Sequence, residues 1–147
     1  MRFTKLLLVP ILAATAVLMA APAHAADEWD SVSGLPANPQ HCRDAYSPTG
    51  GGPADLYICW NDSLTSVYVG AYAADTEEDG YHVEAQIRYQ VFTGGSWSGW
   101  HQRTPTYAAG VGTSAQAFYK ARYVTRNVQG RGCVYNGNTQ IHCNGWS

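Results

Sequence analysis

Three polar side chains near the middle of the chain, His82, Glu84 and Arg88, are of types that carry acid–base chemistry. Successive side chains of an extended strand alternate between its faces, so these three would share one face. A carboxylate base, a histidine acid and an arginine that stabilises phosphoryl oxygens would suit phosphodiester transfer. The wet face of an ordinary sheet also contains such residues. The pattern therefore leaves enzymatic activity uncertain, and we expect a protein without it.

Two tryptophans, Trp97 and Trp100, lie in the Gly- and Ser-rich run GGSWSGW. A turn of this composition holds side chains outward, and exposed aromatic faces stack on sugar rings and mark interaction sites. We predict a ligand-binding loop here, which Tyr68, Tyr72 and His101 would extend. The alternative is that a small domain buries its large aromatic side chains in the core.

An acidic run contains Asp75, Glu77 and Asp79, whose oxygens are ligands of the kind that calcium prefers. The segment as a whole does not match an EF-hand loop, and close acidic side chains are common in a solvated turn. We therefore expect no metal site, with these three residues as the alternative, and no cofactor.

The first 25 residues have the composition of a secretory signal peptide. A short basic start is followed by an apolar run from Leu6 to Ala21 and by the small-residue site Ala23-His24-Ala25. The apolar run is shorter than the roughly 20 residues that span a bilayer. We predict cleavage before Ala26, a secreted protein, and no membrane attachment after cleavage.

Four cysteines follow the predicted signal peptide: Cys42, Cys59, Cys133 and Cys143. An even number of cysteines in an exported domain predicts disulfides rather than a zinc site. Of the three ways to pair them we favour Cys42–Cys59 and Cys133–Cys143, because short loops close most readily.

Period-two alternation of apolar and polar residues marks the strands that would position these side chains. It runs through residues 65–73, 81–92 and 114–126, and we expect the first two to form a hairpin around the acidic turn. A final hairpin is predicted over residues 133–141, where Asn-Gly favours a tight turn.

Proline and glycine interrupt the segment 26–54, which we predict to be a loop-rich N-terminal part. Residues 55–147 are predicted to form the domain proper. Close strand spacing with turns between the strands favours an all-β fold, a small antiparallel β-sandwich or barrel of six to eight strands with two disulfides.

The charge balance limits the class of partner. Removal of Arg2 and Lys5 with the signal peptide would leave 11 acidic and seven basic residues. A nucleic-acid partner is therefore not expected, since no basic excess exists to neutralise phosphates.

Two local resemblances extend these expectations. The chain resembles small secreted actinobacterial proteins of uncharacterised function in two features. One is an acidic turn that leads through Asp79-Gly80 into a strand. The other is a late Arg-rich strand followed by paired cysteines, here from Arg122 to Cys143. That resemblance implies export and a β-sandwich. The stretch 81–84, Tyr-His-Val-Glu, resembles part of a motif of small secreted microbial ribonucleases, which implies RNA cleavage.

We therefore expect a secreted, non-enzymatic binding module whose aromatic loop holds an extracellular polysaccharide or a secreted protein. One alternative is an inhibitor of a hydrolase, which would use the disulfide-anchored loop between Cys42 and Cys59. The other is a small secreted ribonuclease-like enzyme that uses His82, Glu84 and Arg88.

Overall fold

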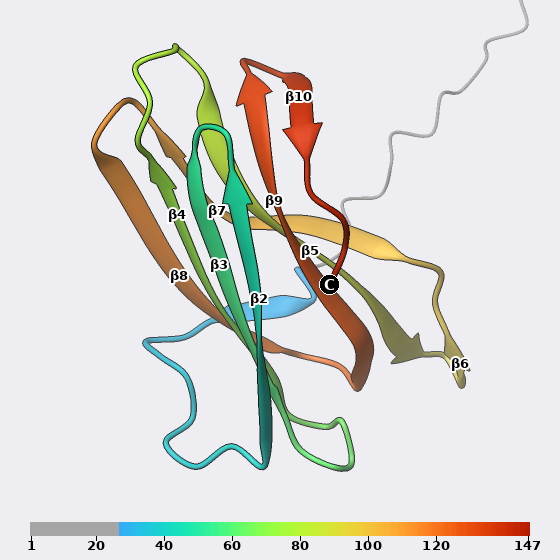
Figure 1. Ribbon diagram of the computed structural model, residues 1–147. Helices are drawn as coiled ribbons and strands as arrows, with labels where there is room; N and C mark the ends of the chain where they lie inside the picture. Colours follow the sequence, from blue (N-terminus) through green and yellow to red (C-terminus); the bar gives the residue numbers. More distant parts are fainter. Residues whose placement is uncertain (1–26) are drawn as a thin grey trace, which may run out of the picture.

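The structure is a computed structural model that describes residues 27–147, the side chains of residues 46–48 excepted. The predicted signal peptide lies outside these residues. The described chain forms ten β-strands in antiparallel sheets (Figure 1). The strands are β1 (Trp29–Ser31), β2 (His41–Thr49), β3 (Gly52–Trp60), β4 (Val67–Asp75), β5 (His82–Thr93), β6 (Ser96–Trp97), β7 (His101–Ala109), β8 (Thr113–Ala121), β9 (Thr125–Asn136) and β10 (Thr139–Cys143).

Two sheets face each other across the core. The sheet with the order β1-β8-β4-β3-β2 is called here the β4 sheet. The second sheet has the order β10-β9-β5-β6, with β7 also paired to β5, and is called the β5 sheet. The predicted all-β fold is confirmed. The strands outnumber the six to eight expected because β1 and β6, of three and two residues, are too short to show a period. No helix in the described part of the chain could span a bilayer.

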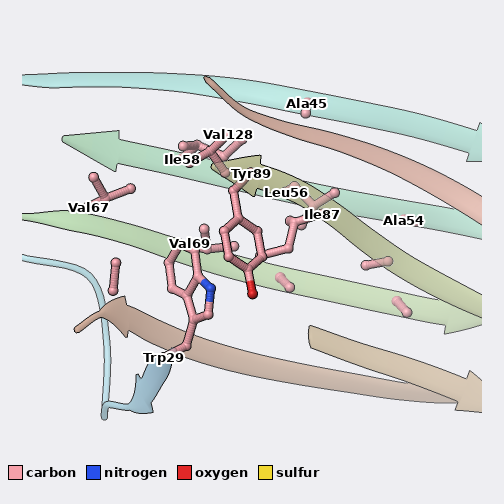
Figure 2. Close-up of a cluster of buried hydrophobic side chains, with 14 of the residues drawn as sticks. Trp29, Ala45, Ala54, Leu56, Ile58, Val67, Val69, Ile87, Tyr89 and Val128 are labelled. Carbon is pink, nitrogen blue, oxygen red and sulfur yellow. The ribbon is translucent and has the colours of Figure 1, made fainter. Parts of the chain in front are cut away.

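The alternating runs produce the core because each turns one face inward. Val67 and Val69 of β4 and Val83 and Ile87 of β5 belong to one buried cluster between the sheets, and all four are at most 2% exposed. Figure 2 shows the inward side chains of both sheets packed together in the core. Burial of each such side chain contributes roughly 1.5–3 kcal/mol to folding, so this cluster is the main source of stability.

The predicted hairpin of residues 65–73 and 81–92 is wrong, although both runs are strands. β4 pairs with β3 and β8, whereas β5 pairs with β9 and β7, so the acidic turn crosses from one sheet to the other. Alternation shows which side chains share a face of a strand. It does not show which strand is the neighbour, so two consecutive strands can belong to opposite sheets and still both turn their apolar faces to the core.

The N-terminal segment is more ordered than the loop-rich part predicted for residues 26–54. β1 pairs with β8, and Trp29 is 1% exposed and packs edge-on against Tyr89, with ring centroids 5.1 Å apart. A three-residue strand has no detectable period, so the sequence pattern does not reveal a core tryptophan there.

The β2–β3 hairpin also falls largely inside that segment. β2 is an edge strand, where proline is tolerated because one side of the backbone is unpaired, and Pro48 lies opposite Pro53 in the register. Gly52 has a φ of 146°, and a Cβ there would lie 2.1 Å from the carbonyl oxygen of Ala74. The glycines that favoured a loop therefore form the tight turn of a hairpin.

Both predicted disulfides are confirmed. Cys42–Cys59 joins β2 to β3, and Cys133–Cys143 joins β9 to β10. In each bridge the two cysteines are directly opposite in the strand register. Each bridge stabilises the fold by about 3 kcal/mol in the chain-entropy account, and the second also fixes the segment that follows β10.

Candidate functional site: the outer face of the β5 sheet

The outer face of the β5 sheet carries an unbroken row of polar side chains. Between buried residues of β5, the outward positions are occupied by His82, Glu84, Gln86, Arg88 and Gln90. The register of the sheet places outward side chains of β9 opposite them. Cross-strand neighbours lie on the same face, so the two rows make contact.

Two arginines and two tryptophans form a stack on this face. The guanidinium carbon of Arg88 lies 4.5 Å from the ring centroid of Trp100 and 4.9 Å from that of Trp146. The guanidinium carbon of Arg131 lies 4.2 Å from the Trp146 ring. These distances are within the range of cation–π attraction, which contributes about 0.5–1 kcal/mol at exposed sites. Trp100 remains 50% exposed, so part of its indole is open to a ligand.

The chain that follows β10 brings Trp146 into the stack. It returns alongside β9, as Figure 1 shows, and pairs with it through backbone hydrogen bonds. The amide of Asn144 donates to the carbonyl of Gly132 at 3.0 Å, and Ser147 and Gly130 exchange bonds of 2.9 and 3.0 Å. These bonds hold Trp146 over β9.

Gln86 is the centre of the hydrogen-bond network beneath this face and is 2% exposed. Its amide nitrogen donates to Glu84 at 2.7 Å and to the Tyr135 hydroxyl at 2.9 Å. Its oxygen accepts from Gln102 at 3.1 Å and from Nε and Nη2 of Arg131 at 3.0 and 2.9 Å. A buried amide with all these partners holds its neighbours in fixed positions.

A hollow of about 500 Å³ opens at the His82 end of the same face. The His82 ring stacks on Tyr135, with centroids 5.5 Å apart and planes at 17°, and its Nε2 lies 3.2 Å from Oε1 of Glu84. Thr104 donates to the other Glu84 oxygen at 3.0 Å. Tyr107, which is 60% exposed, forms part of the rim.

The structure brings together two of the three residues predicted for phosphodiester chemistry. His82 and Glu84 are in contact. Arg88 lies four residues beyond Glu84, roughly 13 Å along the strand, and stacks on Trp100 and Trp146 instead. The guanidinium nearer to the hollow is that of Arg131, which Gln86 holds.

Five of the six arginines of the described chain fall into two groups by their partners, and the sixth, Arg43 of β2, donates to the carbonyl of Val128. Arg103 and Arg122, beside β1, contact the carboxylates of Asp27 and Asp30 at 2.5 and 2.6 Å. The three on β5 and β9, Arg88, Arg126 and Arg131, contact indoles and amide oxygens, and none has a carboxylate partner among residues 27–147. The second group is therefore an uncompensated positive charge on this face.

Burial lowers the pKa of Arg131, and the like charge of Arg88 lowers it further, against an opposing effect of Tyr135. The group stays charged at neutral pH, since the ordinary pKa of an arginine lies far above neutrality. An anion placed between the two guanidinium groups would relieve their repulsion.

The five residues predicted to bind a ligand do not form one site. Trp100 belongs to the stack, but Trp97 is half-buried under Arg126, 4.0 Å from its ring, and against Phe92. Tyr68 and Tyr72 lie on β4, in the other sheet.

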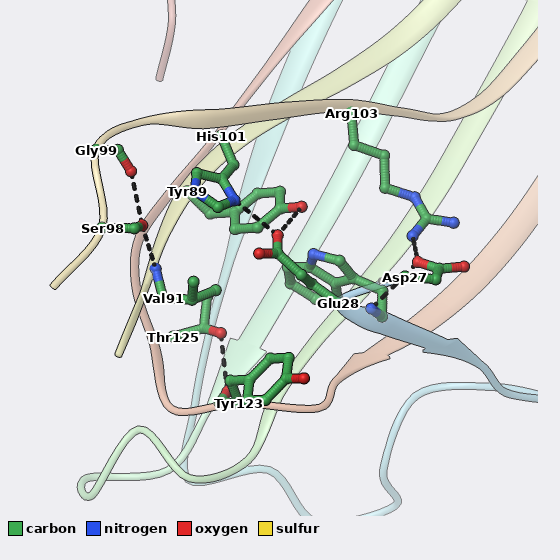
Figure 3. Close-up of polar contacts among 11 residues, drawn as sticks. Asp27, Glu28, Tyr89, Val91, Ser98, Gly99, His101, Arg103, Tyr123 and Thr125 are labelled. Atoms are coloured by element: carbon green, nitrogen blue, oxygen red, sulfur yellow. Dashed lines mark hydrogen bonds and ion pairs between the residues drawn. The ribbon is translucent and has the colours of Figure 1, made fainter. Parts of the chain in front are cut away.

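His101 points to the inner side, as Figure 3 shows. Its Nδ1 lies 2.8 Å from the Glu28 carboxylate, which also accepts the Tyr89 hydroxyl at 2.8 Å. Burial, and then the bond to Glu28, raise the pKa of Tyr89. His101 thus fastens the N-terminal segment to the β5 sheet and takes no part in the outer face.

A second hollow, of about 510 Å³, lies on the outer face of the β4 sheet beside Tyr72. Tyr57 and Phe118 supply aromatic walls, and Asp44 and Asp55 supply carboxylates. Burial, and then the charge of Asp44, raise the pKa of Asp55. Two carboxylates therefore lie together over β2 and β3 of one sheet, whereas Arg88, Arg126 and Arg131 lie over β5 and β9 of the other.

The acidic turn has a structural role at its first residue. Asp75 is 2% exposed, and its two oxygens accept the backbone amides of Glu77 at 3.3 Å and Gly110 at 2.7 Å. Asp79 accepts the amide of Tyr81 at 2.8 Å. Across residues 27–147 no group of three His, Cys, Asp or Glu side chains is arranged to hold a metal.

The segment that the inhibitor alternative would use is the β2–β3 hairpin. Its β3 strand lies between β2 and β4 in the sheet, so its backbone is already paired on both sides. β2 is the end strand of this sheet, so one edge of β2 and the turn are the parts of the hairpin that are not paired within the β4 sheet.

Comparisons of the chain with family models, curated proteins and solved structures found no match. Function is therefore inferred from the chemistry of the outer face alone.

Proposed function

We propose that this protein is a secreted binding module that holds an extracellular polysaccharide on the outer face of the β5 sheet. The observation that carries the proposal is the combination of open aromatic surface with a dense set of fixed hydrogen-bonding side chains on one sheet. Sugars offer both apolar CH faces and hydroxyl groups, so they are bound by surfaces of this composition.

The aromatic part of this surface is contributed by Trp100, Trp146 and Tyr107. Trp100 and Tyr107 are 50% and 60% exposed, and both lie on β7 or just before it. They are therefore placed along one side of the polar row. A glycan chain that runs parallel to β5 could stack on both residues.

The polar part of the surface is contributed by Gln102, Thr104 and Glu84, which line the His82 hollow. Their amide, hydroxyl and carboxylate groups can together donate and accept hydrogen bonds, as sugar hydroxyls require. Two disulfides fit an oxidising compartment and support the proposal that the protein is exported.

The test is retention of the purified, oxidised protein on chitin, cellulose and peptidoglycan, followed by affinity measurement on the best ligand. Trp100→Ala and Tyr107→Ala should each weaken binding by at least about tenfold, ~1.4 kcal/mol. The matched control is Tyr57→Ala, an aromatic side chain 41% exposed on the opposite sheet. Unchanged affinity in the Trp100→Ala Tyr107→Ala double variant, or a loss confined to Tyr57→Ala, would contradict the proposed face.

Ribonuclease-like activity is the second candidate, and the contact between His82 and Glu84 is the observation that favours it. These side chains could exchange a proton with a bound ribose hydroxyl, with Arg131 as the nearer cation. Release of short fragments from RNA by the wild-type protein, abolished in Glu84→Gln, would support this activity. Intact RNA after prolonged incubation would exclude it.

A further inference from the structure

The arginines of the β5 sheet point to the charge of the ligand, an inference that rests on the proposed polysaccharide site. Arg103 of β7 and Arg122, both beside β1, are neutralised by aspartates. Arg88 and Arg131 are held against the same indole, that of Trp146, without a carboxylate partner in the described chain. Keeping two like charges together costs free energy, which a bound anion would recover.

The donors of these two arginines are only partly used. Nε of Arg88 donates to Gln129 at 2.7 Å, and Nε and Nη2 of Arg131 both donate to Gln86. Within residues 27–147 the terminal N–H groups of Arg88 make no hydrogen bond, so they can bind a ligand. Both guanidinium groups are already held in place by the amides beneath them and by the indoles.

Guanidinium groups match carboxylates in shape, since two parallel N–H donors meet two oxygens. Beside them, Trp100 offers an indole that is 50% exposed to stack on a sugar ring. A carboxylate and a pyranose ring occur together in a uronic acid. We infer that the polysaccharide is acidic, and that a uronate carboxylate binds between Arg88 and Arg131 while its ring lies on Trp100.

Nucleic acid is the competing polyanion for this pair of arginines. Glu84 on the same row and the formal net charge of −2 act against any long polyanion, a polyphosphate and a polyuronate alike. The preference for a uronate therefore rests on the pyranose ring that stacks on Trp100, and RNA binding is one of the outcomes of the test.

The inference is tested with polygalacturonate and with the same polymer after methyl esterification, which removes the carboxylate charge and keeps the sugar. Binding to the full, oxidised protein is measured by affinity electrophoresis and calorimetry. We expect binding to polygalacturonate to be at least about tenfold tighter than to its ester, and to weaken in high salt.

The decisive variant is Arg88→Gln, which removes the cation and keeps a polar side chain. It should lose roughly 10- to 100-fold in affinity for polygalacturonate and little for the ester. Arg122→Gln is the matched control, because it makes the same change of net charge at an arginine that Asp30 already neutralises. Arg88→Lys keeps the charge without the planar fork and should be intermediate. Unchanged circular dichroism and melting temperature establish that each variant folds.

The outcomes separate this inference from the proposed function. Equal binding to the acidic polymer and its ester, or equal losses in Arg88→Gln and Arg122→Gln, overturns the uronate inference and leaves a neutral polysaccharide site. Tight binding to RNA but not to polygalacturonate also overturns it. Absence of binding to every acidic and neutral polysaccharide refutes the proposed function as well.

Discussion

Replacement of Trp29 by alanine tests whether the N-terminal segment is part of the folded domain. Trp29 is 1% exposed and packs against Tyr89 in the core between the sheets. Deleting a buried indole costs about 3–5 kcal/mol, because the lost transfer free energy is added to that of the cavity left behind. With an m-value of about 2 kcal/mol/M in urea, the unfolding midpoint should fall by roughly 2 M.

The same substitution at Trp100 is the internal control. Trp100 is 50% exposed and contacts Arg88, so Trp100→Ala should cost at most about 1 kcal/mol. Urea unfolding followed by circular dichroism, with disulfides intact, gives both values. A Trp29→Ala variant that loses less than about 1 kcal/mol, or no more than Trp100→Ala, would refute the assignment of β1 to the core.

Two further predictions concern the pH dependence of stability and the disulfides. Because the pKa of Tyr89 is raised in the folded protein, its neutral form stabilises the fold fully below the ordinary tyrosine pKa of about 10, and this contribution is lost as pH rises through the folded-state value. Difference spectroscopy of phenolate formation should find one tyrosine that ionises later than the rest, and simultaneous ionisation of all would contradict the prediction. Replacement of Cys133 and Cys143 by alanine should cost roughly 2–5 kcal/mol, as should replacement of Cys42 and Cys59. Polysaccharide binding should fall more in the first variant, since Trp146 follows β10, and equal binding would count against the stack as the ligand site.

Sequence alone predicted the elements whose information is local. Alternation over residues 81–92 identified β5 and placed His82 and Glu84 on one face, where they are in contact. The cysteine spacing predicted both bridges, because short loops join neighbouring strands. The period of a strand and the length of the loop that each cysteine pair closes are both local properties of the sequence.

What the sequence could not predict was set by strand order. Tyr68 and Trp100 lie on opposite sheets of the sandwich, because β4 and β5 do not pair. The arginine–tryptophan stack could not be predicted for a similar reason. Trp146 lies beyond the last strand and reaches Arg131 through backbone pairing with β9, a contact that local periodicity does not reveal.

The buried amide of Gln86 has a consequence for how any ligand would bind. Because this side chain, with Arg131, Gln102 and Tyr135, is already immobilised by mutual hydrogen bonds, a ligand would meet a surface whose conformational entropy was lost when the chain folded. Association should therefore be a single kinetic step with little rearrangement of the protein. Gln86→Leu should keep Arg131, Gln102 and Tyr135 on the surface but remove the hydrogen bonds that fix their conformations. A ligand would then have to order these side chains on binding.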